Sequence, residues 1–323
     1  MRTWLYRAAT DGTVSGQSRV YRGPEDLRLL QAVAREVWRH DPRTVDVGGT
    51  VGEIAWSLAG LTPGDVWSGH IWLDDGDPLA WATLQWEPEV ISRPGEREAR
   101  PDTLEWQTRP AHVGLLDEIL DWAESEATTH GLAASARAAN TAAVASLESR
   151  GYAVDRTAPW NLLNVRPLDH IPEPVVPDGH RLTTMAELDD VVRRVAVHRA
   201  AWDGSTMSER RYRQIMRTWP YRADLDCVVE APSGELVASA LAWYDPGLGV
   251  GELEPVGTHR DHRRKGIARA VNLYALHRLK AAGATEAIVA CRGDADYPAP
   301  KQLYESVGFR ELSRQVAYVR RLR

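Results

Sequence analysis

Apolar and polar positions follow two different periods along the chain. Residues 115–130 and 267–282 carry apolar side chains at three- and four-residue spacing, which predicts a helix in each segment. Shorter apolar runs come in pairs around turn-forming residues, and each pair predicts a β-hairpin. One hairpin turns at Asp74–Asp77 and the other at Pro232–Gly234.

The second half of the chain has the clearer pattern, and its predicted elements follow the order β-α-α-β-β-β-α-β-α-β. A meander combined with one crossover favours an α/β fold with a mixed (α+β) sheet and excludes an all-β fold or a helical bundle. Ser208 is the predicted N-cap of the second helix. The predicted strands are 180–185, 225–231, 236–245, 251–259, 286–291 and 315–321, and the predicted helices are 186–202, 208–219, one starting near 266, and 300–307.

The two halves of the chain are similar to each other, which indicates an internal duplication. The first half ends in SLESRGY (146–152) and the second in LYESVGF (303–309), and a Pro-rich stretch lies between the halves. Prolines at that density exclude a helix or a central strand and are typical of a linker. We therefore expect a first domain over 1–165, a linker over 166–179 and a second domain over 180–323.

Composition and charge exclude several functional classes. The chain has 323 residues, 43% of them hydrophobic and 26% charged, which is ordinary for a globular protein of two domains. Its net charge of −6 provides no basic face for a nucleic acid. Two distant cysteines, Cys227 and Cys291, predict neither a disulfide framework nor a thiolate zinc site, so we expect a cytoplasmic protein. No apolar run has the length of a signal peptide or a membrane span, and no membrane partner is expected.

The most informative segment joins a predicted strand to the helix near 266. It reads Arg263-Arg264-Lys265-Gly266-Ile267-Ala268. The first backbone N–H groups of a helix are unpaired and its dipole is positive there, so this end attracts anions. Gly266 and the small Ala268 would let a phosphate approach the backbone, and the three basic residues add positive charge. The pattern predicts a diphosphate site, and the alternative is an ordinary helix start after a basic surface loop.

With this segment and LYESVGF, the chain resembles the GNAT superfamily of acyl-CoA-dependent N-acetyltransferases. The pyrophosphate motif of that family, Q/R-x-x-G-x-G/A, is matched by Arg263, Gly266 and Ala268. The resemblance covers about 180–323 and extends to 1–165 through the internal repeat, as in tandem GNAT proteins such as mycothiol synthases. It implies acetyl-CoA as co-substrate and no metal. The implied acetyl-CoA-binding residues are Val256, Gly257, Thr258, Arg263, Arg264, Lys265, Gly266, Ile267 and Ala268.

The resemblance also implies catalytic residues. Glu252 lies eleven residues before Arg263, where several family members have the general base, and Glu254 faces the same way on a regular strand. Two neighbouring acids raise each other's pKa, which suits a base acting through a water. Tyr304 matches the family tyrosine that protonates the leaving thiolate. The alternatives are two solvated glutamates and a tyrosine packed in the core.

The acceptor is expected to be a primary amine of a small molecule. Family members line the acceptor site from the region that here holds the predicted helices 186–202 and 208–219. The candidate residues there are Trp202, Met207, Tyr212 and Tyr221, which at helical spacing are also typical of a core. Two other functions remain open at this stage: a non-catalytic acyl-CoA-binding or regulatory module, and a protein N-acetyltransferase. A monomer or a homodimer is expected.

The first half departs from the motif. Aligning Gly114 with Gly266 places Ala111 at the position of Arg263 and Leu116 at that of Ala268, and Leu147 replaces Tyr304. Lost charge and added bulk would both obstruct a diphosphate, so we expect a degenerate, non-catalytic copy. Asn140 keeps an asparagine that many family members have, whereas the second half has Tyr297 there.

Three further patterns are not interpreted as sites. His259 and His262 lie in a loop without a third ligand within reach in the sequence, so no metal is expected. Cys291 is interpreted as a small buried apolar residue. The segment GGTVGE (48–53) has the glycines of a phosphate loop without a basic residue after them, and we expect a turn.

Overall fold

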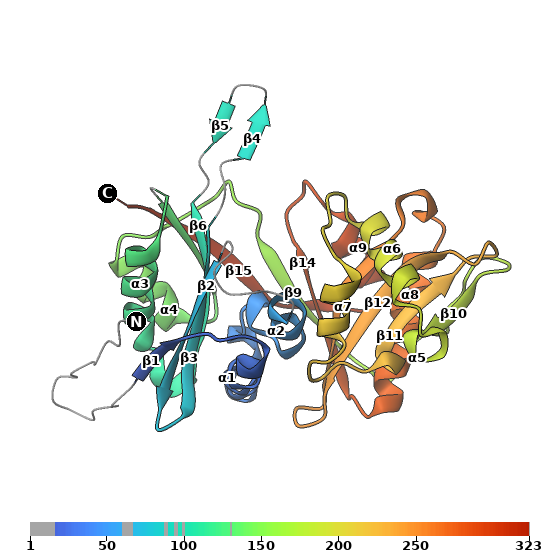
Figure 1. Ribbon diagram of the computed structural model, residues 1–323, viewed down its shortest axis with the longest axis horizontal. Coiled ribbons are helices and arrows are strands. Elements are labelled where there is room, and N and C mark those ends of the chain that lie inside the picture. Colours follow the sequence, from blue (N-terminus) through green and yellow to red (C-terminus); the bar gives the residue numbers. More distant parts are fainter. Residues whose placement is uncertain are drawn as a thin grey trace. The chain divides into compact units, whose positions relative to one another are not determined.

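The protein is represented by a computed structural model, which describes residues 17–59, 67–86, 90–93, 96–98, 101–129 and 131–322 (Figure 1). The described residues form two compact units. The first takes the described residues of 17–50, 67–160 and 313–322, and the second takes those of 51–59 and 161–312. Both units are discontinuous in the sequence.

This division differs from the contiguous domains expected over 1–165 and 180–323. The reason is strand pairing. Strand β9 (Asn161–Pro167) pairs along its length with β14 (Glu286–Arg292), while β15 (Arg310–Arg321) pairs with β7 (Gly131–Arg137). Each sequence half therefore contributes its last strand to the other half's sheet, because inter-strand hydrogen bonds rather than chain continuity define a sheet.

The first unit is a mixed sheet covered by helices. Its strands run in the order β1-β2-β3-β6-β7-β15, with β8 beside β15, and β6 and β7 are its parallel pair. Apolar residues of α3 and α4 share one core cluster with the sheet. The bounds are β1 Gln17–Val20, β2 Trp67–Asp74, β3 Asp77–Gln85, β6 Asp102–Thr108, β8 Ala153–Val154, α1 Leu27–His40, α3 Leu115–Glu126 and α4 Thr141–Ser149, with a separate hairpin of β4 Val90–Arg93 and β5 Glu96–Glu98.

The second unit has the same plan. Its strands run in the order β9-β14-β13-β12-β11-β10, and β13 and β14 are its parallel pair. The bounds are β10 Arg181–Thr184, β11 Asp226–Glu230, β12 Leu236–Asp245, β13 Val250–Thr258, α2 Val51–Leu58, α5 Met185–Leu188, α6 Val191–Ala201, α7 Glu209–Ile215, α8 Ile267–Ala282 and α9 Ala299–Ser306. The predicted fold class, a mixed sheet flanked by helices in each of two units, is confirmed.

One predicted helix is broken. The segment 186–202 forms α5 and α6, which are separated by Asp189 and Asp190. Asp189 adopts a left-handed conformation with φ 46°, and the Asp190 side chain accepts a hydrogen bond from the backbone N–H of Arg193. Aspartate competes with the helical backbone in this way and so begins a new helix. The predicted N-cap at Ser208 is confirmed, since its side chain accepts from the N–H of Arg211.

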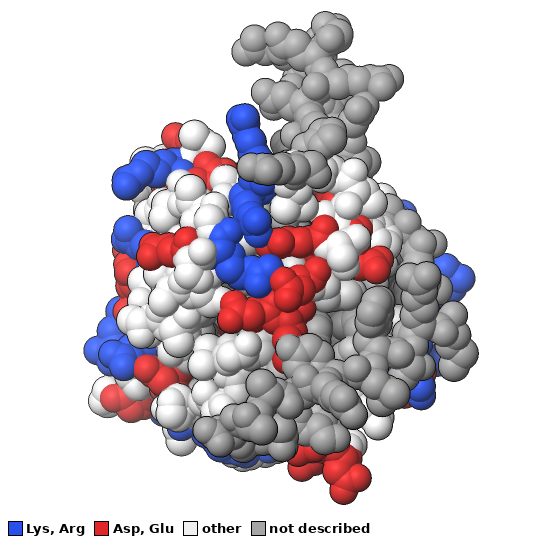
Figure 2. All heavy atoms as spheres, turned by 90° about the vertical axis from the view of Figure 1, so that its left-hand side faces the viewer, with Lys and Arg blue, Asp and Glu red and all other residues white. Residues whose placement is uncertain are grey.

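Charge on the surface is mixed. On the face in Figure 2, acidic and basic side chains lie side by side, and no broad area of one sign is visible among the residues coloured there. Ion pairs within the first unit fit this distribution, for example Arg150 with Asp121 and Glu124.

In both units the parallel strands separate after three residue pairs. Strands β13 and β14 are paired from Val250↔Glu286 to Glu252↔Ile288, and β6 and β7 from Asp102↔Leu132 to Leu104↔Ala134. On its other side β13 has a bulge against β12, where Glu254 and Pro255 together lie opposite one residue. A bulge redirects a strand and its side chains, and Pro255 has no N–H to donate.

A buried ion pair fixes two helices of the second unit to its sheet. The Arg194 and Asp226 side chains are fully buried, and Nε of Arg194 donates to Oδ1 of Asp226 at 2.8 Å. The hydroxyls of Tyr212 and Tyr221 donate to Oδ2 of Asp226. Asp226 therefore connects α6, α7 and the segment after α7 to β11.

We expect Asp226→Ala to lower the free energy of unfolding by about 3–5 kcal/mol, because it leaves the Arg194 charge buried without its counterion. Asp224→Ala, which removes a partly exposed partner of Arg222 and Arg278, should lower it by about 1 kcal/mol or less. Denaturant unfolding of the two variants and the parent measures this. Equal losses in both variants would show that the buried pair does not hold the unit together.

Candidate functional site

The loop before α8 is the candidate anion-binding segment, and we call its residues 263–266 the anion loop. The chain leaves β13 through a 3-10 turn, Arg260–His262, and enters α8 at Ile267 after Gly266, whose φ is 79°. This left-handed conformation favours glycine. A Cβ at Gly266 would have no atom within 4 Å, so the backbone at the start of the helix faces open space.

The basic residues of this loop are exposed. Arg263 donates through Nη2 to the carbonyl of Ala201 at 3.0 Å, and Lys265 donates through Nζ to the carbonyl of Asp261 at 3.0 Å. Arg264 has a φ of 63°. Ile267 is buried and Ala268 half-buried, so Ile267 offers only its backbone N–H to a ligand.

The backbone of Val256–Thr258 has a strand partner on one side. These residues pair with Ala238–Ala240 of β12, while the pairing of β13 with β14 ends at Glu252. The ring of Trp202 lies very close to the backbone of Gly257, because a Cβ at that position would overlap the ring. The open edge of β13 therefore lies between the loop and the carboxylates described next.

Three carboxyl groups influence one another in the second unit. Glu252 and Glu254 come from β13, and Glu53 comes from α2. Burial, with the neighbouring charge of Glu252, raises the pKa of Glu53 to about 7. Burial, with the charges of Glu53 and Glu252, raises the pKa of Glu254 well above its ordinary value. The backbone N–H of Gly52 donates to Oε2 of Glu252 at 2.8 Å, so the first turn of α2 holds that carboxylate.

Tyr304 lies within electrostatic reach of this cluster. Its side chain is buried on α9, and burial followed by the charge of Glu254 raises its pKa well above the ordinary value. The hydroxyl is therefore protonated at neutral pH and can donate a proton. The structure thus places Glu252, Glu254 and Tyr304 around the region where β13 leaves β14.

The candidate acceptor residues have different surroundings. Trp202 is half-buried, lies against Gly257 and stacks on His198 with 4.5 Å between ring centroids. The hydroxyls of Tyr212 and Tyr221 bind Asp226, and Met207 is buried. Trp202 is therefore the one of these four that lies directly beside the open strand, while Tyr221 contacts Trp243, whose Nε1 donates to the carbonyl of Glu254.

Sequence reasoning missed α2. The segment GGTVGE was expected to be a turn, but a 3-10 turn at Val47–Gly49 is followed by a helix from Val51. Apolar residues at 51, 54, 55 and 58 have helical spacing and could have predicted the helix. No local signal indicates that it belongs to the second unit.

The structure also describes the surroundings of the patterns that were not interpreted as sites. Among the described residues no group of three or more His, Cys, Asp or Glu side chains could hold a metal ion. Burial raises the pKa of the Cys291 thiol, and Asn164 Nδ2 donates to its sulfur at 3.4 Å. This environment disfavours the thiolate that nucleophilic chemistry needs.

The first unit lacks the anion loop. Its 3-10 turn, Pro110–His112, is followed by two residues before α3, whereas four residues separate the corresponding turn from α8. Gly114 has a helical φ of −61°, unlike Gly266. Counted from the 3-10 turn, Ala111 corresponds to Asp261 and not, as expected, to Arg263. The loop that follows the turn is two residues shorter than in the second unit.

Comparison with protein families decides the classification. Residues 194–309 match the family described as Acetyltransferase (GNAT) family. This segment of the second unit is therefore similar to GNAT acetyltransferases. The matched residues include the open edge of β13, the anion loop and Tyr304, all within the second unit, which we call the GNAT unit from here on.

Solved structures have the same fold over nearly the whole chain. A GCN5-related N-acetyltransferase from Sphaerobacter thermophilus has a TM-score of 0.61 at 19% identity, covering 95% of this chain and 96% of that chain. A tandem GNAT protein from the clavulanic acid biosynthesis pathway has a TM-score of 0.62 at 13% identity, covering 95% and 98%. A GNAT-family acetyltransferase from Colwellia psychrerythraea has a TM-score of 0.54 at 11% identity, covering 94% and 98%. No curated protein matches the chain by sequence. None of the helices in the described part of the chain is long and apolar enough to cross a membrane.

In the GNAT unit, Gly52→Ala tests the contact between α2 and Glu252. An added Cβ would lie 2.5 Å from Oε2 of Glu252 and from Cδ1 of Trp243, so we expect a loss of about 1–3 kcal/mol in unfolding free energy. Denaturant unfolding measures the loss. Gly114→Ala is the matched control, because a Cβ there meets nothing within 4 Å and φ is helical; it should change stability by about 1 kcal/mol or less. A Gly52→Ala variant as stable as the control would show that α2 does not pack closely on β13.

Proposed function

We propose that the protein transfers an acetyl group from acetyl-CoA to the primary amine of a small molecule, and that the GNAT unit performs the reaction. The observation that carries the proposal is the open edge of β13, which has buried carboxyl groups at one end and an anion loop at the other. A thioester with a diphosphate tail would fit this arrangement along its whole length.

The residues of this region fit acetyl-CoA. The diphosphate would lie at the start of α8, against the backbone N–H groups near Gly266 and the cations of Arg263, Arg264 and Lys265. The amides of the pantetheine arm would pair with the backbone of Val256–Thr258, whose polar groups need partners. When bound, acetyl-CoA supplies the activated acyl group.

The residues of the chain would then move two protons. A carboxylate of the Glu252–Glu254 pair takes a proton from the acceptor ammonium, directly or through a water, which leaves a nucleophilic amine. The amine nitrogen bonds to the acyl carbon as the bond from carbon to sulfur breaks. The Tyr304 hydroxyl gives its proton to the departing sulfur, and the phenolate is protonated again by the proton that the acylated nitrogen loses as it becomes a neutral amide. Trp202, beside the open strand, is the acceptor-side residue that the geometry supports best, with Tyr221 and Met207 as more distant members.

The first unit is proposed to be a degenerate copy without catalytic activity. Its shorter loop, the helical φ of Gly114 and the buried Leu147 in α4 support this proposal. A cytoplasmic protein that is a monomer or a homodimer belongs to the same proposal, and the two buried free cysteines are compatible with a reducing compartment.

Isothermal titration of acetyl-CoA tests the proposal. We expect one binding event for the wild type and none for Gly266→Glu, because the added carboxylate repels the diphosphate and occupies its space. Tyr304→Phe should still bind acetyl-CoA, but with a panel of primary amines as acceptors it should release free CoA thiol from acetyl-CoA at least about 100-fold more slowly. Two binding events would contradict the degenerate copy, and no binding would contradict the acyltransferase proposal.

The pH dependence of turnover tests the carboxyl cluster. Because burial and the charge of Glu53 raise the pKa of Glu254 above its ordinary value, the base is protonated in acid, and kcat/KM should rise with pH over a range above the ordinary range of a glutamate. Glu53→Gln removes a charge that raises the pKa of Glu254, so the acid limb should move to lower pH while turnover is kept.

The control for this variant is Glu209→Gln, which alters an exposed carboxylate of α7 and should leave the pH profile unchanged. A loss of activity of more than about 100-fold in Glu53→Gln, without a shift of the acid limb, would instead make Glu53 the base.

A further inference from the structure

One partly buried arginine of the GNAT unit has no carboxylate partner among the residues that the structure describes. Arg211 lies on α7 and is half-buried. Its Nε is buried without a hydrogen-bond partner, and the hydrogen bond that its guanidinium makes is a long one, 3.5 Å from Nη2 to the carbonyl of Ser57. Burial lowers the pKa of Arg211. Charges that leave water in proteins are normally paired, so an anionic ligand would complete the surroundings of this side chain.

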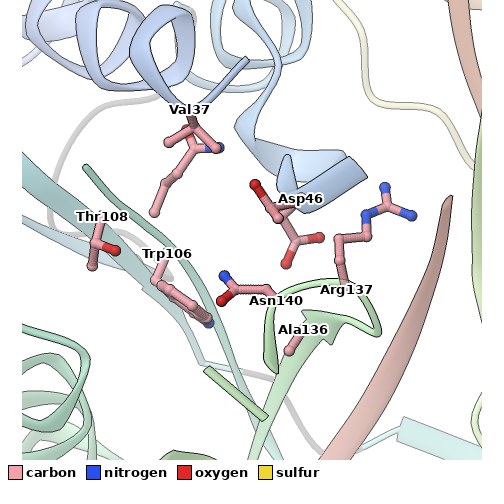
Figure 3. A pocket seen from close by; sticks show the side chains of 9 residues that line it. Val37, Asp46, Trp106, Thr108, Ala136, Arg137 and Asn140 are labelled. Atoms are coloured by element: carbon pink, nitrogen blue, oxygen red, sulfur yellow. The ribbon is translucent and has the colours of Figure 1, made fainter. Parts of the chain in front are cut away.

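Two other arginines of the chain are more deeply buried and already lie beside an acid. Arg194 binds Asp226 in the GNAT unit. In the first unit, Arg137 and Asp46 line the same small cavity (Figure 3). The charge of Asp46 raises the pKa of Arg137, against the effect of burial. The charge of Arg211 therefore differs from both in having no such neighbour among the described residues.

Helix α2 connects Arg211 to the carboxyl cluster. The half-buried residues of α2 are Glu53, Trp56 and Ser57, which lie on one face of the helix. The hydroxyl of Ser57 donates to Oε1 of Glu53, and its carbonyl accepts the hydrogen bond from Arg211. Glu53 and Ser57 are four residues apart, about 6 Å along the helix. The cation and the carboxyl cluster thus adjoin the same partly exposed face, about one helical turn from each other.

Aromatic rings lie beside this face. Trp56 contacts His198 with 5.3 Å between ring centroids, and His198 stacks on Trp202, next to the open edge of β13. Burial lowers the pKa of His198 to about 4, with a further contribution from the charge of Arg211, so this ring is neutral at pH 7. A single guanidinium beside a neutral ring matches a carboxylate, with its one charge, better than a phosphate, which carries up to two.

We propose that Arg211 binds a carboxylate of the acceptor, and that the acceptor is an ω-amino acid. This inference rests on the function proposed above, because it places the ammonium group of the same molecule at the Glu252–Glu254 pair. An α-amino acid has both groups on one carbon and does not span a helical turn, whereas a chain of five or six carbons does. Its methylene groups would contact Trp56 and Trp202.

The first test is ligand-observed NMR without acetyl-CoA. The probes are 6-aminohexanoate, its carboxamide 6-aminohexanamide, which has the same length without the negative charge, and the shorter 3-aminopropanoate. We expect a Kd of about 1 mM for 6-aminohexanoate, as is reasonable for so small a ligand. The carboxamide and 3-aminopropanoate should both bind about tenfold or more weakly, because each loses one of the two charged contacts.

Variants assign the carboxylate to Arg211. Arg211→Gln removes the charge, so it should weaken the binding of 6-aminohexanoate about tenfold or more and leave the Kd of 6-aminohexanamide unchanged. Arg211→Lys keeps a charge without the planar fork and should give an intermediate Kd. The matched control is Arg213→Gln, at an exposed arginine of the same helix, which should leave both Kd values unchanged. Circular dichroism confirms that each variant is folded, and the ligand pair on the wild type decides the question even where a variant is not.

Turnover with acetyl-CoA separates this inference from the proposed function. The wild type should acetylate 6-aminohexanoate with a kcat/KM at least about tenfold above that of 6-aminohexanamide, and Arg211→Gln should remove this preference. Acetylation of both amines without preference would contradict the role of Arg211 and leave the acyltransferase function standing. Binding of 6-aminohexanoate through Arg211 without any acetylation would contradict the proposed function instead.

Three outcomes of the binding experiment would overturn the inference. The first is that 6-aminohexanoate does not bind, or binds no more tightly than its carboxamide. The second is that 3-aminopropanoate binds as tightly as 6-aminohexanoate, so that the two charged ends are not recognised together. The third is that folded Arg211→Gln binds 6-aminohexanoate with the Kd of the wild type.

Discussion

The backbone of β13 beyond Glu252 is the constraint on which the rest of the GNAT unit depends. Its polar groups are paired with β12 on one side, and the described pairing with β14 stops at the third residue. Backbone groups at such an edge need water or a ligand. The bulge against β12 at Glu254 and Pro255 lies just beyond this point, and the charge of Glu254 acts on the buried Tyr304.

The interacting carboxyl groups of the GNAT unit come from distant parts of the sequence. Glu53 and Glu252 are separated by 199 positions, yet α2 brings them together and its Gly52 N–H binds the Glu252 carboxylate. Bringing three carboxyl groups close together is unfavourable when all are ionised, and the raised pKa of Glu53 and of Glu254 expresses that cost. A carboxyl group whose pKa is raised binds a proton more readily than an ordinary glutamate, which is what a base for an ammonium substrate requires.

Local patterns predicted much of this arrangement, and non-local pairing determined the rest. The anion loop, the two hairpins, the Ser208 cap and the mixed sheet depend on residues close in sequence, where helix periodicity and turn chemistry apply. The exchange of β9 and β15 between the halves depends on which distant strands form hydrogen bonds, and a sequence pattern does not encode this. The place of α2 has the same cause: its apolar spacing predicts a helix, but its partners Trp243 and Glu252 lie about 190–200 residues away.

The two units share one backbone opening but surround it with different side chains. In each, a parallel pair separates after three residues, so duplication preserved the geometry. What differs is the set of side chains at the opening. The GNAT unit has acids and an anion loop, whereas the first unit has a shorter loop and the carboxamide of Gln107 without a hydrogen-bond partner. Carboxyl groups with raised pKa values suit proton transfer, so the side chains around the opening, and not the opening itself, distinguish the two units.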